Sequence, residues 1–162
     1  MIERDTMDYD VVIVGAGPAG LAAAIRLRQL DPQRTVCVLE KAAEVGGHAL
    51  SGAVMEHGPL DALLPGWREN MPSICVPAQR DEFRLLTRTG VTRLPVPPQQ
   101  HNAGNFILSL GQLAAQLAQA AEGLGVDVLA GFAASALLYE NGRVAGVRVG
   151  DMGLDADGNP GP

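Results

Sequence analysis

The stretch Asp10-Val-Val-Ile-Val-Gly-Ala-Gly-Pro-Ala-Gly20 decides the fold of this chain. Its first half is a continuous β-branched apolar run, which is typical of a strand buried on both faces and indicates a central strand of a parallel sheet. Its second half fits Gly-x-Gly-x-x-Gly, a pattern that is weak alone but stands here between a predicted strand and a predicted helix. The stretch therefore predicts the phosphate-binding turn of a Rossmann-like domain.

The residues that follow complete a βαβ unit. Apolar residues recur at helical spacing from Pro18 to Gln29, and Asp31-Pro32 ends that helix. Thr35 to Leu39 then repeats the buried-strand pattern. Because a strand, a helix and a second strand fall in order, we expect a parallel sheet with a right-handed crossover. The predicted fold class is α/β, a Rossmann-like parallel sheet with helices.

The last third of the chain predicts further regular structure. Apolar residues from Leu110 to Leu124 follow the i, i+3, i+4, i+7 spacing of a core-facing helix, and Gly123 or Gly125 is expected to end it. A strand at Val126 to Leu129 should follow. The dipeptide Asn141-Gly142, which suits a type I′ turn, predicts an added hairpin of two strands, 134–140 and 143–149.

The middle of the chain, 42–100, is punctuated by glycine and proline and is predicted to be mostly loop. We expect one short strand at Phe83 to Thr87 and one short helix at Leu60 to Leu64. Trp67 follows that helix. A tryptophan at such a position more often packs over the core as a lid than stacks against a ligand, so we expect a packing role.

The glycine-rich turn carries the chemistry. Gly15 allows a tight exit from the strand, Gly17 leaves no side chain in the space of a pyrophosphate, and Gly20 lets the helix pack against the strand. The free N–H groups of the helix N-terminus, with Pro18 and Ala19 in its first turn, favour bound phosphate. Such a turn predicts a dinucleotide site.

Two features indicate which dinucleotide is bound. Glu40 ends the second strand twenty residues after Gly20, where a carboxylate can accept hydrogen bonds from ribose hydroxyls, and no arginine follows to bind a 2′-phosphate. The segment Gly46-Gly47-His48-Ala49-Leu50-Ser51-Gly52 then favours FAD over NAD, because glycines there let the backbone approach a longer, extended cofactor. His48 either contacts the flavin or is an ordinary loop residue; His57 and His101 are weaker candidates.

Composition excludes several classes of function. The 162 residues carry a net charge of −6, so no basic surface for nucleic acid is expected. The two cysteines are far apart and belong to no metal-binding pair, so no metal site is expected, and Cys37 should be a buried strand residue. Asp155, Asp157 and Gly158 are interpreted as a plain turn instead of a calcium loop. No apolar run reaches membrane-spanning length, and no leader pattern is present at the N-terminus.

Three segments together resemble the start of the electron-transfer flavoprotein:ubiquinone oxidoreductases: VVIVGAGPAGLAAAIRL, VLEKAAEVGGHALSGAV, and the block from GNFILSLGQ to GVRVGDMG. The resemblance implies an enzyme that holds FAD and a 4Fe-4S cluster, accepts electrons from electron-transfer flavoprotein and reduces ubiquinone at a membrane surface. It implies a peripheral position on the cytoplasmic face of a bacterial inner membrane. The matching adenosine and pyrophosphate contacts are Gly15, Gly17, Pro18, Ala19, Gly20, Glu40 and Lys41, and the matching flavin-side residues are Gly47, His48, Ser51 and Gly52.

The resemblance also sets expectations for the rest of the chain. No side chain need be a catalytic acid or base, because the flavin supplies the redox chemistry. Residues 91–106 match a membrane-facing loop, in which Leu94, Val96 and Phe106 are diluted by polar residues. Residues 1–162 are interpreted as an incomplete FAD-binding domain that does not ligate the cluster and is inactive by itself. The alternatives are another FAD oxidoreductase of the geranylgeranyl-reductase type and a non-catalytic remnant.

Overall fold

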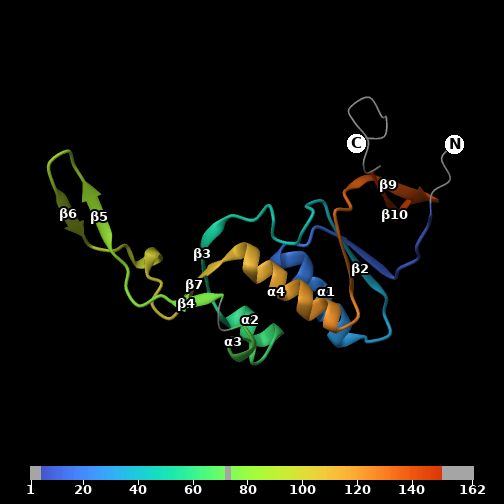
Figure 1. Cartoon of the computed structure of the whole chain (residues 1–162), viewed down its shortest axis with the longest axis horizontal. Helices are drawn as coiled ribbons and strands as arrows, with labels where there is room; N and C mark the ends of the chain where they lie inside the picture. The colour runs from blue at the N-terminus through green and yellow to red at the C-terminus, as the bar shows by residue number, and fades with distance from the viewer. Residues whose placement is uncertain (1–4, 72–73, 151–162) are drawn as a thin grey trace. The chain divides into compact units, whose positions relative to one another are not determined.

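The structure is a computed structural model that describes residues 5–71 and 74–150. The chain divides into two compact units, each considered by itself below: residues 1–49 with 113–162, and residues 50–112. Figure 1 shows the elements of both.

The first unit contains the predicted βαβ motif. Strand β1 (Val11–Val14) leads into helix α1 (Pro18–Leu30) and then into β2 (Val36–Glu40), which lies parallel to β1 with Val11 opposite Val36. Strand β8 (Asp127–Ala130) adds to the other side of β2, also parallel. The α/β fold class with a parallel sheet is therefore confirmed.

The position of β1 in this sheet differs from the prediction. The strand order is β1-β2-β8, so β2 is the central strand and its residues Val36 to Leu39 are buried. Among the residues that the structure describes, β1 has a neighbour on one side only, and its Val14 is 60% exposed. The prediction of a central strand buried on both faces was wrong for β1, because an apolar β-branched run does not reveal which strands flank it.

Two helices bury their apolar faces in this unit as predicted. Helix α1 buries Leu21, Ala24 and Ile25. Helix α4 (Leu110–Gly123), which begins in the second unit, buries Leu113, Ala114, Leu117, Ala118 and Ala121. Gly125 takes the left-handed conformation just after α4, with φ +80°, and Val126 N–H donates to the carbonyl oxygen of Ala121 at 3.1 Å. The expected end of the helix at glycine is confirmed.

The predicted hairpin is present as β9 (Ala134–Glu140) and β10 (Arg143–Val149). Asn141 has φ +49° and Gly142 has φ +75°, the two positive values that a type I′ turn requires. The local turn signal was therefore sufficient to predict both strands.

The second unit has more regular structure than the sequence indicated. Helix α2 (Gly58–Leu63) and strand β5 (Phe83–Leu86) confirm two predictions. The prediction of mostly loop elsewhere missed five short elements of the unit: β3 (Ser51–Met55), α3 (Trp67–Asn70), β4 (Cys75–Pro77), β6 (Val91–Leu94) and the 3-10 helix η1 (Pro98–Gln100). Strand β7 (Phe106–Ser109) lies between β3 and β4 in an antiparallel sheet, and β5 pairs with β6.

Residues 91–106 include regular secondary structure. The segment is not a continuous loop, because it contains β6, η1 and the first residue of β7. Phe106 is held against Trp67, with the ring centroids 5.4 Å apart and the planes at 79°. Within the described residues, none of the helices has the length and apolar character needed to cross a membrane.

Candidate functional site

The glycine-rich turn joins β1 to α1 at the carboxyl end of the sheet. Gly15 has φ +103°, and its N–H donates to the carbonyl oxygen of Leu39 at 2.7 Å, which ties the turn to β2. Gly17 is the N-cap of α1 in extended conformation, and Pro18 occupies the first turn. No side chain caps this helix end, and its first turn has no acidic residue. The N–H groups and positive dipole end are therefore available to an anion.

Gly17 and Gly20 have different roles in this turn. A Cβ added at Gly17 would meet nothing within 4 Å, so the fold itself does not require glycine there. A Cβ at Gly20 would lie 2.2 Å from the carbonyl oxygen of Gly15 and 3.2 Å from Cγ2 of Ile13. Gly20 is therefore needed for packing of helix against strand, whereas the open space beside Gly17 fits a ligand group approaching the backbone.

Glu40 reaches the same turn from the end of β2. Its Oε2 accepts a hydrogen bond from the Ala16 N–H at 2.9 Å, and its Oε1 accepts one from the Ala42 N–H at 2.8 Å. Burial raises the pKa of this carboxyl, but the two N–H bonds outweigh it and, with the nearby His48 and Lys41, hold the pKa below its ordinary value. Glu40 is thus ionised, and each carboxylate oxygen retains a further acceptor position for a hydroxyl group.

The loop after Glu40 is anchored at one point and exposed beyond it. Ala42 is buried, and its carbonyl oxygen accepts a hydrogen bond from the Gly131 N–H at 2.7 Å. Past this anchor, Gly47 N–H donates to the Glu44 carbonyl oxygen at 3.2 Å, and the Gly47 and His48 residues are exposed. Lys41 is exposed as well.

The structure places nine of the eleven predicted cofactor residues in the first unit. They comprise the turn, the end of β2 and the loop after it: Gly15, Gly17, Pro18, Ala19, Gly20, Glu40, Lys41, Gly47 and His48. Ser51 and Gly52 belong to the second unit, where Gly52 has φ +82° at an irregularity in the pairing of β3 with β7. What the sequence did not reveal is that the backbone of Ala16 and Ala42 fixes Glu40.

A polar cluster in the second unit was also missed. Asp61 accepts hydrogen bonds from the Trp67 indole at 2.6 Å and from Arg68, and lies 2.5 Å from Nδ1 of His57. The Arg68 guanidinium lies over the Trp67 and Phe106 rings. Trp67 is almost fully buried, which confirms its expected packing role, and His57 is occupied by Asp61.

The cysteines and the remaining histidine add no site. Cys37 is buried in β2 as predicted, and burial, followed by the charge of Asp127, raises the pKa of its thiol. His101 lies 3.2 Å from the Val96 carbonyl oxygen. Across residues 5–71 and 74–150, no three metal-ligating side chains gather. The tail residues Asp155, Asp157 and Gly158 lie outside the described range.

Comparison with known proteins supports the fold and the resemblance. Residues 13–72 match the family described as NAD(P)-binding Rossmann-like domain. An electron transfer flavoprotein-ubiquinone oxidoreductase of Pseudomonas aeruginosa is 49% identical over 98% of this chain, and one from Oryza sativa is 52% identical over 96%. The chain spans 30% and 28% of the length of these two relatives. The similarity to this family that the sequence motifs indicated is confirmed.

Solved structures show the same fold. A geranylgeranyl bacteriochlorophyll reductase-like protein from Thermoplasma acidophilum has a TM-score of 0.63 and 23% identity over 87% of this chain and 34% of its own. The myxobacterial halogenase CndH, named as FAD-dependent, has a TM-score of 0.63 and 20% identity over 93% of this chain and 34% of its own. At these identities the likeness concerns the fold alone.

Proposed function

We propose that this chain, similar over nearly its whole length to electron transfer flavoprotein-ubiquinone oxidoreductases, supplies the FAD-binding part of such an enzyme. The activity in question is transfer of electrons from electron-transfer flavoprotein to ubiquinone. The observation that carries the proposal is the open space at Gly17, beside an uncapped helix N-terminus and a fixed, ionised Glu40.

The residues divide into three roles in this proposal. The turn formed by Gly15, Gly17, Pro18, Ala19 and Gly20 binds the pyrophosphate, because the uncapped N-terminus of α1 offers N–H groups to an anion and Gly17 leaves open space beside it. Glu40 accepts hydrogen bonds from the ribose hydroxyls, with Lys41 beside it. Gly47 and His48 of the first unit bind the flavin side, and the resemblance alone assigns the same role to Ser51 and Gly52 of the second unit.

FAD, when bound, supplies the electron-transfer chemistry, so none of these side chains acts as an acid or base. The chain contributes by binding FAD and by orienting it. The 4Fe-4S cluster that the resemblance implies is proposed to lie outside this chain, because such a cluster takes four ligands and the chain has two cysteines, one of them buried in β2.

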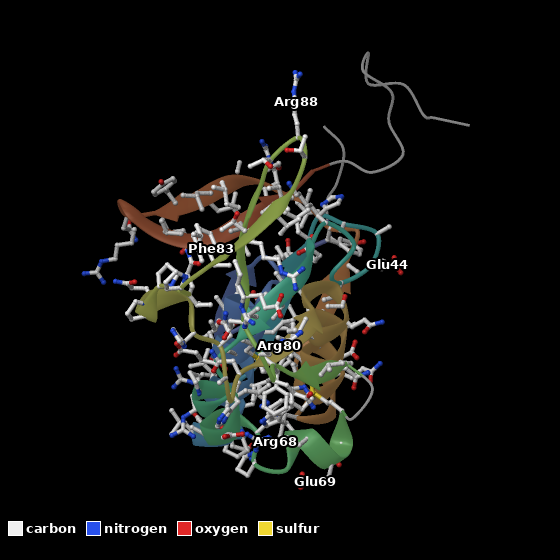
Figure 2. All side chains as sticks on the ribbon, turned by 90° about the vertical axis from the view of Figure 1, so that its left-hand side faces the viewer. Glu44, Arg68, Glu69, Arg80, Phe83 and Arg88 are labelled. Atoms are coloured by element: carbon white, nitrogen blue, oxygen red, sulfur yellow. The ribbon has the colours of Figure 1, made fainter. Side chains whose placement is uncertain are left out.

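Peripheral membrane contact is the remaining part of the proposal, and β5 and β6 are its best candidates. Their exposed apolar residues are Phe83, Leu85, Leu86 and Val91. Residues 80–94 carry four arginines against two acidic side chains, and Figure 2 shows Arg88 extending from the tip of the hairpin. Exposed apolar side chains beside arginines suit an anionic lipid surface.

The test is FAD binding by the purified chain, measured by titration of flavin fluorescence. We expect Gly17→Val to abolish binding while the thermal unfolding midpoint falls only slightly, because a Cβ at this position meets no atom of the fold within 4 Å and the cost is that of a poorer N-cap residue. Gly123→Val is the matched control, since a Cβ added at Gly123 would also meet nothing within 4 Å, but Gly123 is the last residue of α4 and lies outside the glycine-rich turn. Equal FAD affinity for wild type and Gly17→Val would reject the site, and no FAD binding by wild type would favour a non-catalytic role.

A further inference from the structure

The β5–β6 hairpin places two arginines directly opposite each other. In the pairing of the two strands, Arg84 is the partner of Arg93, and both residues are exposed. Like charges at directly opposite positions of an antiparallel ladder repel each other and destabilise the pairing. A hairpin of only two strands has little stability of its own. The arginine pair is therefore stabilised by any anion that contacts both guanidinium groups.

The carboxylates of this segment neutralise the arginines only in part. Glu82 forms ion pairs with Arg80 and with Arg84. A hydrogen bond from Arg84 is the main cause that lowers the pKa of this carboxyl, and the charge of Arg93 contributes as well. One carboxylate thus serves three guanidinium groups. Asp81, the other acid of residues 80–94, accepts its hydrogen bonds from a residue outside the hairpin.

An apolar row lies beside the arginine pair on the same face of the hairpin. Side chains two positions apart on a strand share a face, and Leu86 of β5 is paired with Val91 of β6. This row is about 7 Å along the strands from the arginine pair. Leu86 is 71% exposed and Val91 is 60% exposed. The face therefore combines two guanidinium groups with aliphatic side chains, which suits an amphiphile with an anionic head.

We infer that Arg84 and Arg93 together bind the phosphate group of an anionic phospholipid, whose acyl chains lie against the Leu86–Val91 row. The diverging oxygens of a phosphate can accept hydrogen bonds from two guanidinium groups, whereas a carboxylate is matched by one. The apolar row favours a lipid over free phosphate, and the net charge of −6 disfavours a nucleic acid. The inference rests on the membrane contact proposed above and adds to it a preference for phosphate over other anions.

Vesicle flotation at matched surface charge tests this preference. One set of phosphatidylcholine vesicles contains phosphatidic acid and the other contains oleate, each in the amount that gives the same zeta potential. The general attraction between the chain and an anionic surface is then the same for both sets. We expect wild type to bind the phosphatidic acid vesicles about tenfold more tightly, because two charge-assisted contacts meet one phosphate.

Lysine variants separate recognition from charge. Arg84→Lys and Arg93→Lys keep the charge of the pair but remove the planar group with its fixed donors. We expect each to lose most of the preference for phosphatidic acid and to bind oleate vesicles like wild type. Arg88→Lys is the matched control, because Arg88 extends from the tip of the same hairpin (Figure 2) and lies outside the paired positions. Both of its affinities should stay unchanged. Since all three residues are exposed, thermal unfolding should be the same in every variant.

A calorimetric titration identifies the source of the phosphate. Dihexanoyl phosphatidic acid, a soluble short-chain lipid, should bind the chain more tightly than inorganic phosphate does, because only the lipid covers the apolar row. Equal affinity for the two would assign the site to free phosphate and overturn the inference.

Two further results would overturn the inference and leave the membrane contact in place: equal binding of wild type to the two vesicle sets, and equal effects of lysine at Arg84 and at Arg88. Flotation with neither set would reject the membrane contact, and the calorimetric titration would then decide the phosphate site by itself. None of these readouts depends on flavin, so the outcome for the proposed FAD site is determined separately.

Discussion

At Gly20 the fold itself excludes a side chain. A Cβ there would lie 2.2 Å from a backbone oxygen of Gly15, and that oxygen cannot move without shifting the whole turn. We expect Gly20→Ala to lower the free energy of unfolding by about 1–3 kcal/mol, the usual cost of forcing atoms into a packed site. Urea denaturation followed by circular dichroism measures it. Gly123→Ala is the control and should be neutral or slightly stabilising, since alanine favours a helix; equal stability of both variants would contradict the role of Gly20.

Asp61 makes the second unit sensitive to acid. Hydrogen bonds from Trp67, His57 and Arg68 lower the pKa of this carboxyl from 3.8 to about 2. Because the folded pKa is below the unfolded one, the stabilisation is present above about pH 4 and is lost as the pH falls towards 2. Trp67 is the only tryptophan of the chain, so its fluorescence reports this cluster.

The expected result is a urea midpoint, followed by Trp67 fluorescence, that falls more steeply between pH 4 and pH 2 in wild type than in Asp61→Asn. Other acidic groups titrate in both proteins, so the difference between the two curves isolates Asp61. Parallel curves would show that the cluster gives no stability that depends on its charge.

Among the elements, the C-terminal end of α1 is joined to the end of α4 by one side chain. The Arg28 guanidinium donates to the carbonyl oxygens of Leu124 at 2.7 Å, Pro32 at 2.6 Å and Arg34 at 2.6 Å. Arginine is suited to this because its planar group offers several donors in fixed directions. The contact connects the helix that begins at the glycine-rich turn to the second helix of its unit.

We therefore expect Arg28→Met to lower the free energy of unfolding by about 1–2 kcal/mol, because hydrogen bonds from a charged group are lost at a partly exposed site. Arg26→Met is the control, since Arg26 is exposed and its guanidinium donates to the side chain of Gln29 on the same helix; its change should stay within about 0.5 kcal/mol. Chemical denaturation of both variants measures the two changes in the free energy of unfolding. Equal losses would contradict a special role of Arg28.

The elements also show what a sequence can and cannot reveal. Helices α1 and α4 and the β9–β10 hairpin have local signals, namely apolar spacing, a terminal glycine and Asn141-Gly142, and all were predicted. Strands β3 and β4 were not, because each is short and depends on β7, which lies up to 58 residues away in register. The hydrogen bonds from the Ala16 and Ala42 backbone N–H groups to Glu40 also could not be predicted, because they do not depend on the identity of the donor side chains.

For the molecule as a whole, net charge and local charge oppose each other. The chain carries −6 overall, which disfavours an anionic surface, but residues 80–94 carry four arginines and two acidic residues. Glu82 forms ion pairs with Arg80 and Arg84, and the charge of Arg93 also acts on Glu82, so Arg88 is the arginine of this segment most available to an anionic lipid. We therefore expect the β5–β6 hairpin to decide how the chain is oriented on a lipid surface.

The last prediction concerns this orientation. Leu86 is 71% exposed on β5, so burying it in a lipid interface would contribute about 1.5–3 kcal/mol. We expect the chain to float with vesicles containing anionic lipid, and Leu86→Asp to weaken that partitioning about tenfold or more. Leu138→Asp, an exposed leucine on β9, is the matched control and should have little effect. Added salt should reduce binding, because screening weakens the attraction between Arg88 and the anionic lipid. Equal flotation of wild type and Leu86→Asp would show that the β5–β6 hairpin is not the membrane contact.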